Sequence, residues 1–261
     1  MYKNCIITQQ KDQSFRLRDW ILYHYNEGFD TFIIFDDKSE DNSVYVLQKL
    51  AQTYNININI QITDDEGPIH NQANTKNSNT YHFDGDFHRR IVRSFNRGLN
   101  IVKKHNPDAI CSFTDVDEFL VTDERTNVVD VIKSQFKLLN TSHIYINSFD
   151  VNDDFILDGR WYTLEDTTKM RWDFASMKAS SMWNTRGKSI CYANLLNNIL
   201  PLPARIHYLT ETLTYKFVKP EILRIHHFRK PSYCNDILRV EDDNLFCKMQ
   251  KLKKRLNLPI Y

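Results

Sequence analysis

The amino-acid sequence predicts an α/β protein in which helices wrap a mainly parallel sheet. Over residues 3–62, strand-like apolar runs alternate with segments whose apolar residues recur at helical spacing, which is the pattern of such a sheet. Two of the predicted strands end in acidic clusters, and ligands of these folds bind at the carboxyl ends of the strands. With 261 residues, 41% of them hydrophobic, the chain can bury a sizeable core.

The predicted elements follow one another in a regular order. Apolar or alternating runs bounded by polar residues predict strands at 3–8, 29–35, 55–62, 109–113 and 143–149, with further strand-like runs around Ile206 and Leu223. Helical spacing predicts helices at 15–27, 44–54, 87–104, 127–138 and 245–256. Ser14 is expected to cap the first helix, and Gly28 is expected to end it. Residues 64–86 have little periodicity and predict a long loop that is a candidate lid or binding loop.

No internal repeat or low-complexity linker divides the sequence, so we expect one domain over residues 1–261. Residues 236–261 are expected to form a basic amphipathic helix at its end. The favoured interpretation of this helix is that its leucine stripe packs on the domain and its lysines face water. The alternative is peripheral contact with an anionic membrane.

Composition argues against several classes of protein. The 34 Lys and Arg against 33 Asp and Glu leave a formal charge of +1, which gives no bulk attraction to nucleic acid. No apolar run approaches the roughly 18 residues of a transmembrane segment, and the first residues do not resemble a signal peptide, so we expect a soluble, cytoplasmic protein. The five cysteines are odd in number and lack CxxC spacing, which argues against a disulfide framework and against a zinc site.

The strongest candidate site is the pair Asp115 and Asp117, which follows a predicted buried strand. Residues two apart on a strand point to the same face, so both carboxylates can reach one hard cation and, through it, a phosphate. Glu118 alternates away from the pair, and we expect it to orient the strand end. The alternative is a solvated turn, which we prefer for the other Asp-x-Asp segment at 84–86 because no strand precedes it.

Asp36 and Asp37 end a second predicted strand. Their carboxylates could accept hydrogen bonds from a nucleobase or a ribose hydroxyl, whereas Ser39 and Asp41 could cap the helix that follows. Two acidic strand ends in one sheet predict a crevice between them.

Histidines and cations near the end of the chain form a third candidate segment. Histidine joins carboxylates as a ligand of manganese-like ions, but adjacent histidines in a strand point opposite ways, so only one of His226 and His227 can face a site. Arg229 and Lys230 could neutralise a diphosphate. The helix at 87–104 carries an arginine stripe of Arg89, Arg93 and Arg97, spaced four apart, with Arg90 beside it. A solvated face is favoured for these arginines over a contact with a phosphate or an acidic acceptor.

Taken together, these segments resemble the GT-A glycosyltransferases, most closely family 92 and its family-2-like relatives. The similar stretches run in family order from residue 5 to about 232. They are LRDWILYHYNEGFD at 17–30, FDDKSED at 35–41, DVDEFL at 115–120, GKSI at 187–190, IH at 206–207 and HFRKPS at 227–232.

The resemblance implies a GT-A fold, a Rossmann-like α/β/α sandwich, and metal-dependent transfer of a sugar with inversion. The donor would be a nucleotide sugar linked to UDP or GDP, bound mainly by residues 1–120. The acceptor would be a hydroxyl of a glycan or glycoconjugate, bound with the catalytic groups of residues 121–235. Two alternatives are a sugar-phosphate nucleotidyltransferase and a non-catalytic nucleotide-sugar-binding module. A nucleotidyltransferase would need a Gly-rich loop after the first strand, but residues 9–14 contain no Gly.

The same resemblance implies roles for individual residues. A Mn2+ or Mg2+ ion would be held by Asp115 and Asp117, with His227 as the third ligand. The general base stays open among Asp150, Asp153, Asp154 and Glu165, and we prefer Asp150. Donor-binding residues would be Thr8, Asp36, Asp37, Asp115, Lys188 and Lys230.

Overall fold

The computed structural model describes residues 2–63, 86–151, 169–172, 187–196, 215–228, 238–241 and 244–256. The helices among them are α1 (Ser14–Asn26), α2 (Ser43–Tyr54), α3 (Asp86–His105), α4 (Val128–Leu138), the 3-10 helix η3 (Ala193–Leu196) and α5 (Asn244–Leu256). The strands are β1 (Asn4–Gln10), β2 (Thr31–Asp36), β3 (Asn57–Ile62), β4 (Ile110–Phe113), β5 (Glu118–Val121), β6 (His143–Val151), β7 (Lys169–Trp172), β8 (Gly187–Tyr192), β9 (Lys216–Phe217), β10 (Arg224–Phe228) and β11 (Leu238–Glu241).

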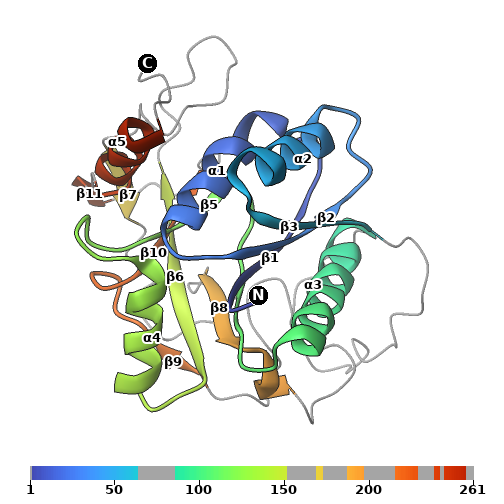
Figure 1. The fold of residues 1–261 in the computed structure, drawn as a ribbon. Coiled ribbons are helices and arrows are strands. Elements are labelled where there is room, and N and C mark those ends of the chain that lie inside the picture. The colour runs from blue at the N-terminus through green and yellow to red at the C-terminus, as the bar shows by residue number, and fades with distance from the viewer. Residues whose placement is uncertain are drawn as a thin grey trace.

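The eleven described strands form one sheet whose main path is β11-β7-β6-β8-β4-β1-β2-β3. In its N-terminal part, β4, β1, β2 and β3 are all parallel, so their carboxyl ends share one edge. Figure 1 shows α1 and α2 on one face of these strands and α3 on the other. The predicted α/β class, with helices on both faces of a parallel sheet, is confirmed here.

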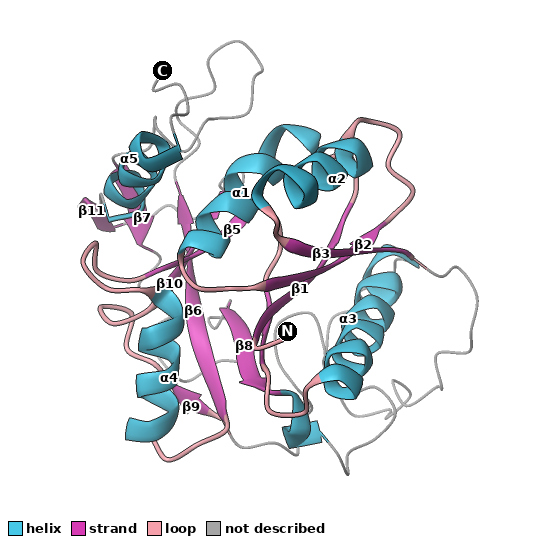
Figure 2. Cartoon of the chain, viewed as in Figure 1, coloured by secondary structure: helices cyan, strands magenta, loops and turns pink. Residues whose placement is uncertain are grey.

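The C-terminal part of the sheet is mixed. β8 runs antiparallel to both of its neighbours, β4 and β6. β10 lies between β5, to which it is antiparallel, and β6, to which it is parallel (Figure 2). This arrangement brings segments far apart in sequence to the edge where β4 ends.

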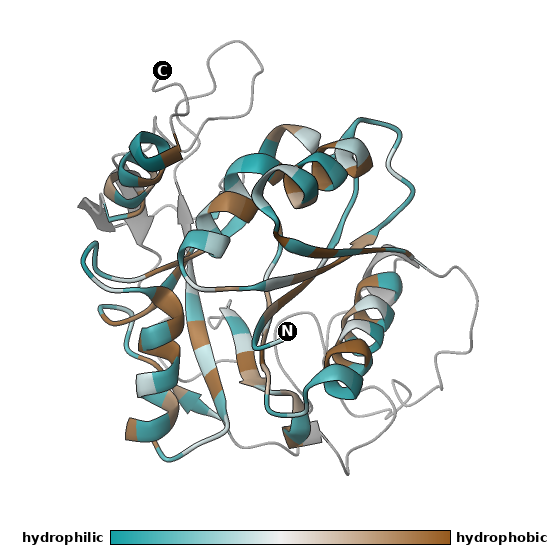
Figure 3. Ribbon diagram, in the orientation of Figure 1, coloured by the Kyte–Doolittle hydropathy of each residue, from teal (hydrophilic) through white to brown (hydrophobic). Residues whose placement is uncertain are grey.

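Burial explains the patterns in the sequence. Every residue of β1 and β2 is buried, and parallel strands covered on both faces read as continuous apolar runs. β3 lies at the edge of the sheet, is mostly half-buried and keeps the alternation of Asn and Ile. Figure 3 shows β1 and β2 as largely hydrophobic ribbons between the helices.

Most predicted elements are present within a few residues of the expected bounds. Gly28 ends α1 at a positive φ of 96°, as expected for a glycine at this position. The prediction that Ser14 caps α1 is wrong, because the helix begins at Ser14 and its N-cap, Gln13, makes no side-chain cap bond. Instead, the carboxylate of Asp41 accepts the Ser14 N–H at 2.9 Å from the neighbouring loop. The predicted loop at 64–86, except Asp86, and the run around Ile206 lie outside the described residues.

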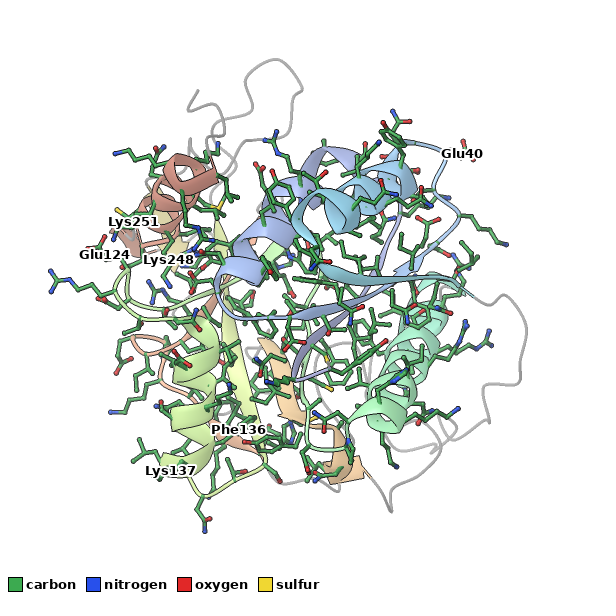
Figure 4. The ribbon with its side chains drawn as sticks, viewed as in Figure 1. Glu40, Glu124, Phe136, Lys137, Lys248 and Lys251 are labelled. Atoms are coloured by element: carbon green, nitrogen blue, oxygen red, sulfur yellow. The ribbon has the colours of Figure 1, made fainter. Side chains whose placement is uncertain are left out.

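The C-terminal helix α5 packs its apolar stripe on the domain, as the favoured interpretation expected. Leu245, Met249 and Leu252 are buried in the same core cluster as residues of α1. Lys248 does not face water: its Nζ lies 2.6 Å from Glu27 Oε2 and 2.9 Å from Thr122 Oγ1. Figure 4 shows Lys248 and Lys251 close to Glu124 beside α5. Within the described parts of the chain, no helix is long and apolar enough to cross a bilayer.

Helix α1 is fastened to β5 by buried hydrogen bonds. Trp20 Nε1 donates to the Glu118 carbonyl oxygen and the Tyr23 hydroxyl to the Leu120 carbonyl oxygen, each at 2.8 Å. His24 Nδ1 lies 2.9 Å from the Trp20 carbonyl oxygen, and its Nε2 accepts the Leu120 N–H at 3.3 Å. This pattern requires a neutral imidazole with its proton on Nδ1.

Stability should fall in acid because of His24. Burial lowers the pKa of His24 to about 3, against the opposing hydrogen bond to Trp20. In the unfolded chain His24 takes up a proton near its ordinary pKa of about 6.5. The stability that depends on neutral His24 is therefore fully present above that pH and is lost as the pH falls toward 3. Between about pH 7.5 and about pH 5, His24 should lower the free energy of unfolding by about 2 kcal/mol.

Urea titrations of wild type and His24→Gln over this pH range measure the effect, and the variant should show a shallower dependence on pH. His105→Gln is the matched control, because His105 is exposed and its replacement should leave the slope unchanged. An NMR titration in which the His24 ring takes up a proton near pH 6 would contradict the assignment.

Candidate functional site

The acidic turn between β4 and β5 is closed by two hydrogen bonds between Asp115 and Glu118, one to a side chain and one to the backbone. The Asp115 N–H donates to Glu118 Oε2 at 3.0 Å, and the Glu118 N–H donates to the Asp115 carbonyl oxygen at 3.0 Å. Glu118 is buried, whereas the side chains of Asp115 and Asp117 are about one-third exposed. Glu118 makes an orienting contact as we expected, but the predicted strand alternation is wrong. Residues 114–117 lie outside the strands, and Glu118 shares the Lys188 ammonium group with Asp115.

A buried cation supports this turn from β8. Lys188 is completely buried, and its Nζ lies 2.6 Å from Asp115 Oδ2 and 3.5 Å from Glu118 Oε2. The preceding Gly187 packs so closely on β6 that a Cβ there would collide with the carbonyl oxygen of Ile146. Lys188, predicted to bind the donor, therefore has its ammonium group committed to the acidic turn.

The electrostatics of the turn depend on Lys188. Burial opposes the charge of Lys188, but Asp115 and Glu118 outweigh it and raise the pKa of Lys188 above its ordinary value. Burial also raises the pKa of Glu118, while Lys188 opposes that rise. For Asp117, burial is outweighed by the hydrogen bond and charge of His227 and by the charges of Arg16 and Lys188, so the pKa of Asp117 is lowered.

One carboxylate oxygen of Asp117 lies close to two side chains, those of His227 and Arg16. His227 Nε2 lies 3.4 Å from Asp117 Oδ2, and Arg16 Nη1 lies 3.8 Å from the same atom. His226 is buried while His227 reaches the turn, as strand alternation predicted. Within the described ranges, no group of three or more His, Cys, Asp or Glu side chains is arranged to hold a metal, so the set of Asp115, Asp117 and His227 stays a prediction.

Of the candidate bases, only Asp150 falls within the described backbone. It lies in β6 directly opposite His227 of β10, which in turn lies opposite Glu118 of β5. The other candidates, and the donor-binding candidate Lys230, lie outside the described residues: Asp153, Asp154, Glu165 and Lys230.

The two carboxylates at the end of β2, Asp36 and Asp37, accept hydrogen bonds from other groups of the protein. Asp36 is buried and accepts hydrogen bonds from Gln10 Nε2 and from the Ser39 N–H. Asp37 is buried and forms a two-pronged pair with Arg90, at 2.8 Å to Nε and 3.0 Å to Nη2. Burial is outweighed by Arg90 and by the Thr63 hydroxyl, which together lower the pKa of Asp37. Direct donor contacts by these carboxylates stay predictions.

The structure also shows the surroundings of Thr8 and of the arginines of α3, for which the sequence predicted possible ligand contacts. Thr8, expected to contact the nucleotide, is completely buried in β1, and its hydroxyl lies 3.4 Å from the Gln9 carbonyl oxygen. The arginines of α3 are not all solvated: Arg97 of the stripe packs over the Phe35 ring at 5.2 Å, and Arg90 beside the stripe pairs with Asp37. These contacts fasten α3 to the end of β2.

Sequence reasoning missed Arg16. The available signal was its spacing: Arg16 precedes Trp20 by four residues, and Trp20 precedes His24 by four, so all three lie along one side of α1. That side of the helix follows the chain from Asp117 to Leu120.

Removing the Lys188 ammonium group should destabilise the protein. In Lys188→Met, two carboxylates lose their buried counter-charge, so the free energy of unfolding should fall by about 3–5 kcal/mol, as when one partner of a buried pair is removed. Lys216→Met changes an exposed lysine of β9 and should alter stability by less than about 0.5 kcal/mol. Urea unfolding at neutral pH measures both, and equal stability of the two variants would contradict the role of Lys188.

Comparison with known proteins gives one family match and several distant structures. A comparison with curated proteins found no match. S. aureus TarS 1–349 is 12% identical with a TM-score of 0.38, and the match covers 75% of this chain and 48% of that one. Its complex with UDP is 13% identical with a TM-score of 0.41, covering 84% and 61%. Glucosyl-3-phosphoglycerate synthase from Mycobacterium tuberculosis, in complex with Mn2+, UDP and glucosyl-3-phosphoglycerate, is 12% identical with a TM-score of 0.39, covering 99% and 81%.

This chain therefore spans about half to three-fifths of the TarS structures that it matches. Those identities and scores are too low to support a functional inference, so the assignment depends on the family match. The model of glycosyltransferase family 92 matches residues 2–257, which is nearly the whole chain. The resemblance predicted from the motifs is confirmed, and the chain belongs to glycosyltransferase family 92.

Proposed function

We propose that the protein is a metal-dependent, inverting glycosyltransferase that moves a sugar from a UDP- or GDP-linked donor to a hydroxyl of a glycan or glycoconjugate. Family membership supports the reaction class. The observation that carries the proposal is the pairing of Asp117 with His227, two side chains from distant segments, beside the end of β4. Ligands of open α/β sheets bind at this carboxyl edge.

The residues at this edge fit a divalent cation. A carboxylate oxygen and an imidazole nitrogen are both ligands of manganese-like ions, and here they lie 3.4 Å apart. Ions of this kind that bind substrate phosphates often take only one or two protein carboxylates, with phosphate and water completing the shell. Asp117 and His227 would hold the ion, with Asp115 beside them. When bound, it would offset the charge that develops on the departing diphosphate.

The chain's own residues would orient the reactants and move one proton. Lys188 holds Asp115 and Glu118 in place, so it would serve the donor through Asp115. Asp150 is the preferred base because its backbone lies beside His227. As the acceptor oxygen bonds to the anomeric carbon, the bond from that carbon to the diphosphate breaks, and the hydroxyl proton moves to the Asp150 carboxylate.

Asp117→Asn and His227→Ala test the metal site. With Mn2+ and a panel of nucleotide sugars, each variant should release nucleoside diphosphate at least about a hundredfold more slowly than wild type, because charge stabilisation of the leaving group is lost. Calorimetry should also show weaker Mn2+ binding in the presence of UDP or GDP. Asp130→Asn, on the exposed surface of α4, is the matched control and should retain both properties.

The outcomes of this assay separate the hypotheses. Tight donor binding by wild type without turnover for any donor or acceptor would favour a non-catalytic binding module. Unchanged Mn2+ affinity in His227→Ala would remove His227 from the ligand set.

Asp150→Asn tests the base. Removing a general base should lower kcat about 10²–10⁴-fold, while nucleoside diphosphate binding stays close to wild type because the metal side chains remain. Steady-state transfer rates and calorimetry measure the two properties on the same preparation. A variant with the wild-type kcat would move the role to Asp153, Asp154 or Glu165.

A further inference from the structure

Arg16 shares its carboxylate oxygen with the proposed metal ligand His227. Its Nη1 lies 3.8 Å from Asp117 Oδ2, the same atom that lies 3.4 Å from His227 Nε2. The Arg16 side chain is only 13% exposed, so its charge is largely withdrawn from water. A cation bound to Asp117 and His227 would therefore meet the Arg16 guanidinium at close range.

Helix α1 gives Arg16 little freedom to withdraw its backbone. One turn further along, Trp20 is buried and bonded to the Glu118 carbonyl oxygen, and a second turn along, His24 is buried and bonded to the Leu120 N–H. Both partners belong to β5, which follows directly after Asp117. These hydrogen bonds hold the backbone of α1 to β5, so a response of Arg16 to a ligand would be a movement of its side chain.

Fixed positive charge already offsets the acidic turn. Lys188 lies within 2.6 Å of Asp115 and 3.5 Å of Glu118 and is completely buried, so it stays in place whatever binds. Because Arg16 is also present, a divalent cation that binds without a diphosphate would bind Asp117 less favourably than it would bind an unpaired carboxylate. Both Arg16 and Lys188 would repel it. A diphosphate would reverse this balance, since its oxygens attract the metal and can accept two parallel N–H bonds from a guanidinium.

We infer that Arg16 binds the diphosphate of the donor and thereby couples donor binding to metal binding. In this arrangement Arg16 lies beside Asp117 Oδ2, together with His227, until a diphosphate binds the guanidinium and the metal takes its place near that oxygen. The inference rests on the proposed function, because it assigns a further residue to the same donor site. It predicts that losing Arg16 changes metal affinity and diphosphate affinity in opposite directions.

Calorimetry on Arg16→Gln tests the coupling. In the presence of Mn2+, UDP and GDP are titrated in turn, and whichever binds wild type should bind the variant about 10- to 100-fold more weakly, the loss expected for a charge-assisted bond. Mn2+ titrated alone should bind the variant roughly three- to tenfold more tightly, because a neighbouring positive charge is gone. The matching nucleoside monophosphate, which lacks the second phosphate, should lose less affinity than the diphosphate.

Two further variants control for the change of charge and of shape. Arg18→Gln removes a 44%-exposed arginine from the same helix, where it pairs with Asp19, and should leave all three affinities near wild type. Arg16→Lys keeps the charge without the planar fork, so Mn2+ alone should bind as in wild type while the diphosphate binds more weakly. It also provides the measurement if Arg16→Gln does not fold.

The outcomes distinguish this inference from the proposed function. Wild type that binds neither UDP nor GDP with Mn2+ would overturn both. Wild type that binds a diphosphate, with Arg16→Gln binding it equally well, would overturn only the role of Arg16. Weaker binding of Mn2+ alone by Arg16→Gln would also overturn the coupling, because it would mean that Arg16 merely holds Asp117 in position.

Discussion

The buried ion cluster of Lys188 with Asp115 and Glu118 is the interaction on which the site depends. It joins β8 to the turn between β4 and β5, and Glu118 in turn lies opposite His227 on β10. A buried cation is unfavourable unless carboxylates lie close enough to compensate its desolvation. Here two do, and the Asp115 N–H supplies an additional bond to Glu118. The same contacts that make the burial of Lys188 tolerable therefore fix the direction in which Asp115 and Asp117 leave the sheet.

Helix α1 supports the turn from the other side. Trp20, Tyr23 and His24 satisfy backbone groups of β5 that would otherwise be buried without partners, which would carry a substantial penalty. The helix is held by polar contacts as well as by apolar packing, so its register along β5 is set to within one residue. This register is what brings Arg16, at the start of the helix, to Asp117. The core and the candidate site thus share the same hydrogen bonds.

Much of the fold was predictable because the burial of a strand or helix produces a recognisable pattern of apolar residues within a short stretch of sequence. The continuous apolar runs of β1 and β2, the Asn and Ile alternation of β3 and the position of Gly28 each reflect the environment of a few consecutive residues. Asp115, Asp117 and His227 were found because each ends or lies on such a run. Partners between distant segments leave no local pattern. Lys188 was expected to bind the donor, because nothing near it in the sequence indicates its carboxylate partners on another strand end. Likewise, nothing near Ser14 indicates that Asp41, from another loop, accepts its N–H. The pairing of Asp37 with Arg90 has the same origin, since α3 must first dock on the sheet.

The position of β10 between β5 and β6 sets the distance between the acidic turn and the proposed base. Glu118, His227 and Asp150 lie opposite one another on three adjacent strands, so the backbones of Glu118 and Asp150 are two strand spacings apart, about 10 Å. Of the proposed metal side chains, Asp117 directly precedes Glu118 at one end of this row, and His227 lies in the middle, on the strand next to that of the proposed base. In a single displacement the leaving group and the attacking hydroxyl stand on opposite sides of the anomeric carbon, so a diphosphate and a base need a separation that admits a sugar ring and an acceptor oxygen. The two strand spacings between the turn that carries Asp117 and the strand of Asp150 would provide this separation, with His227 reaching the ion from the strand between them.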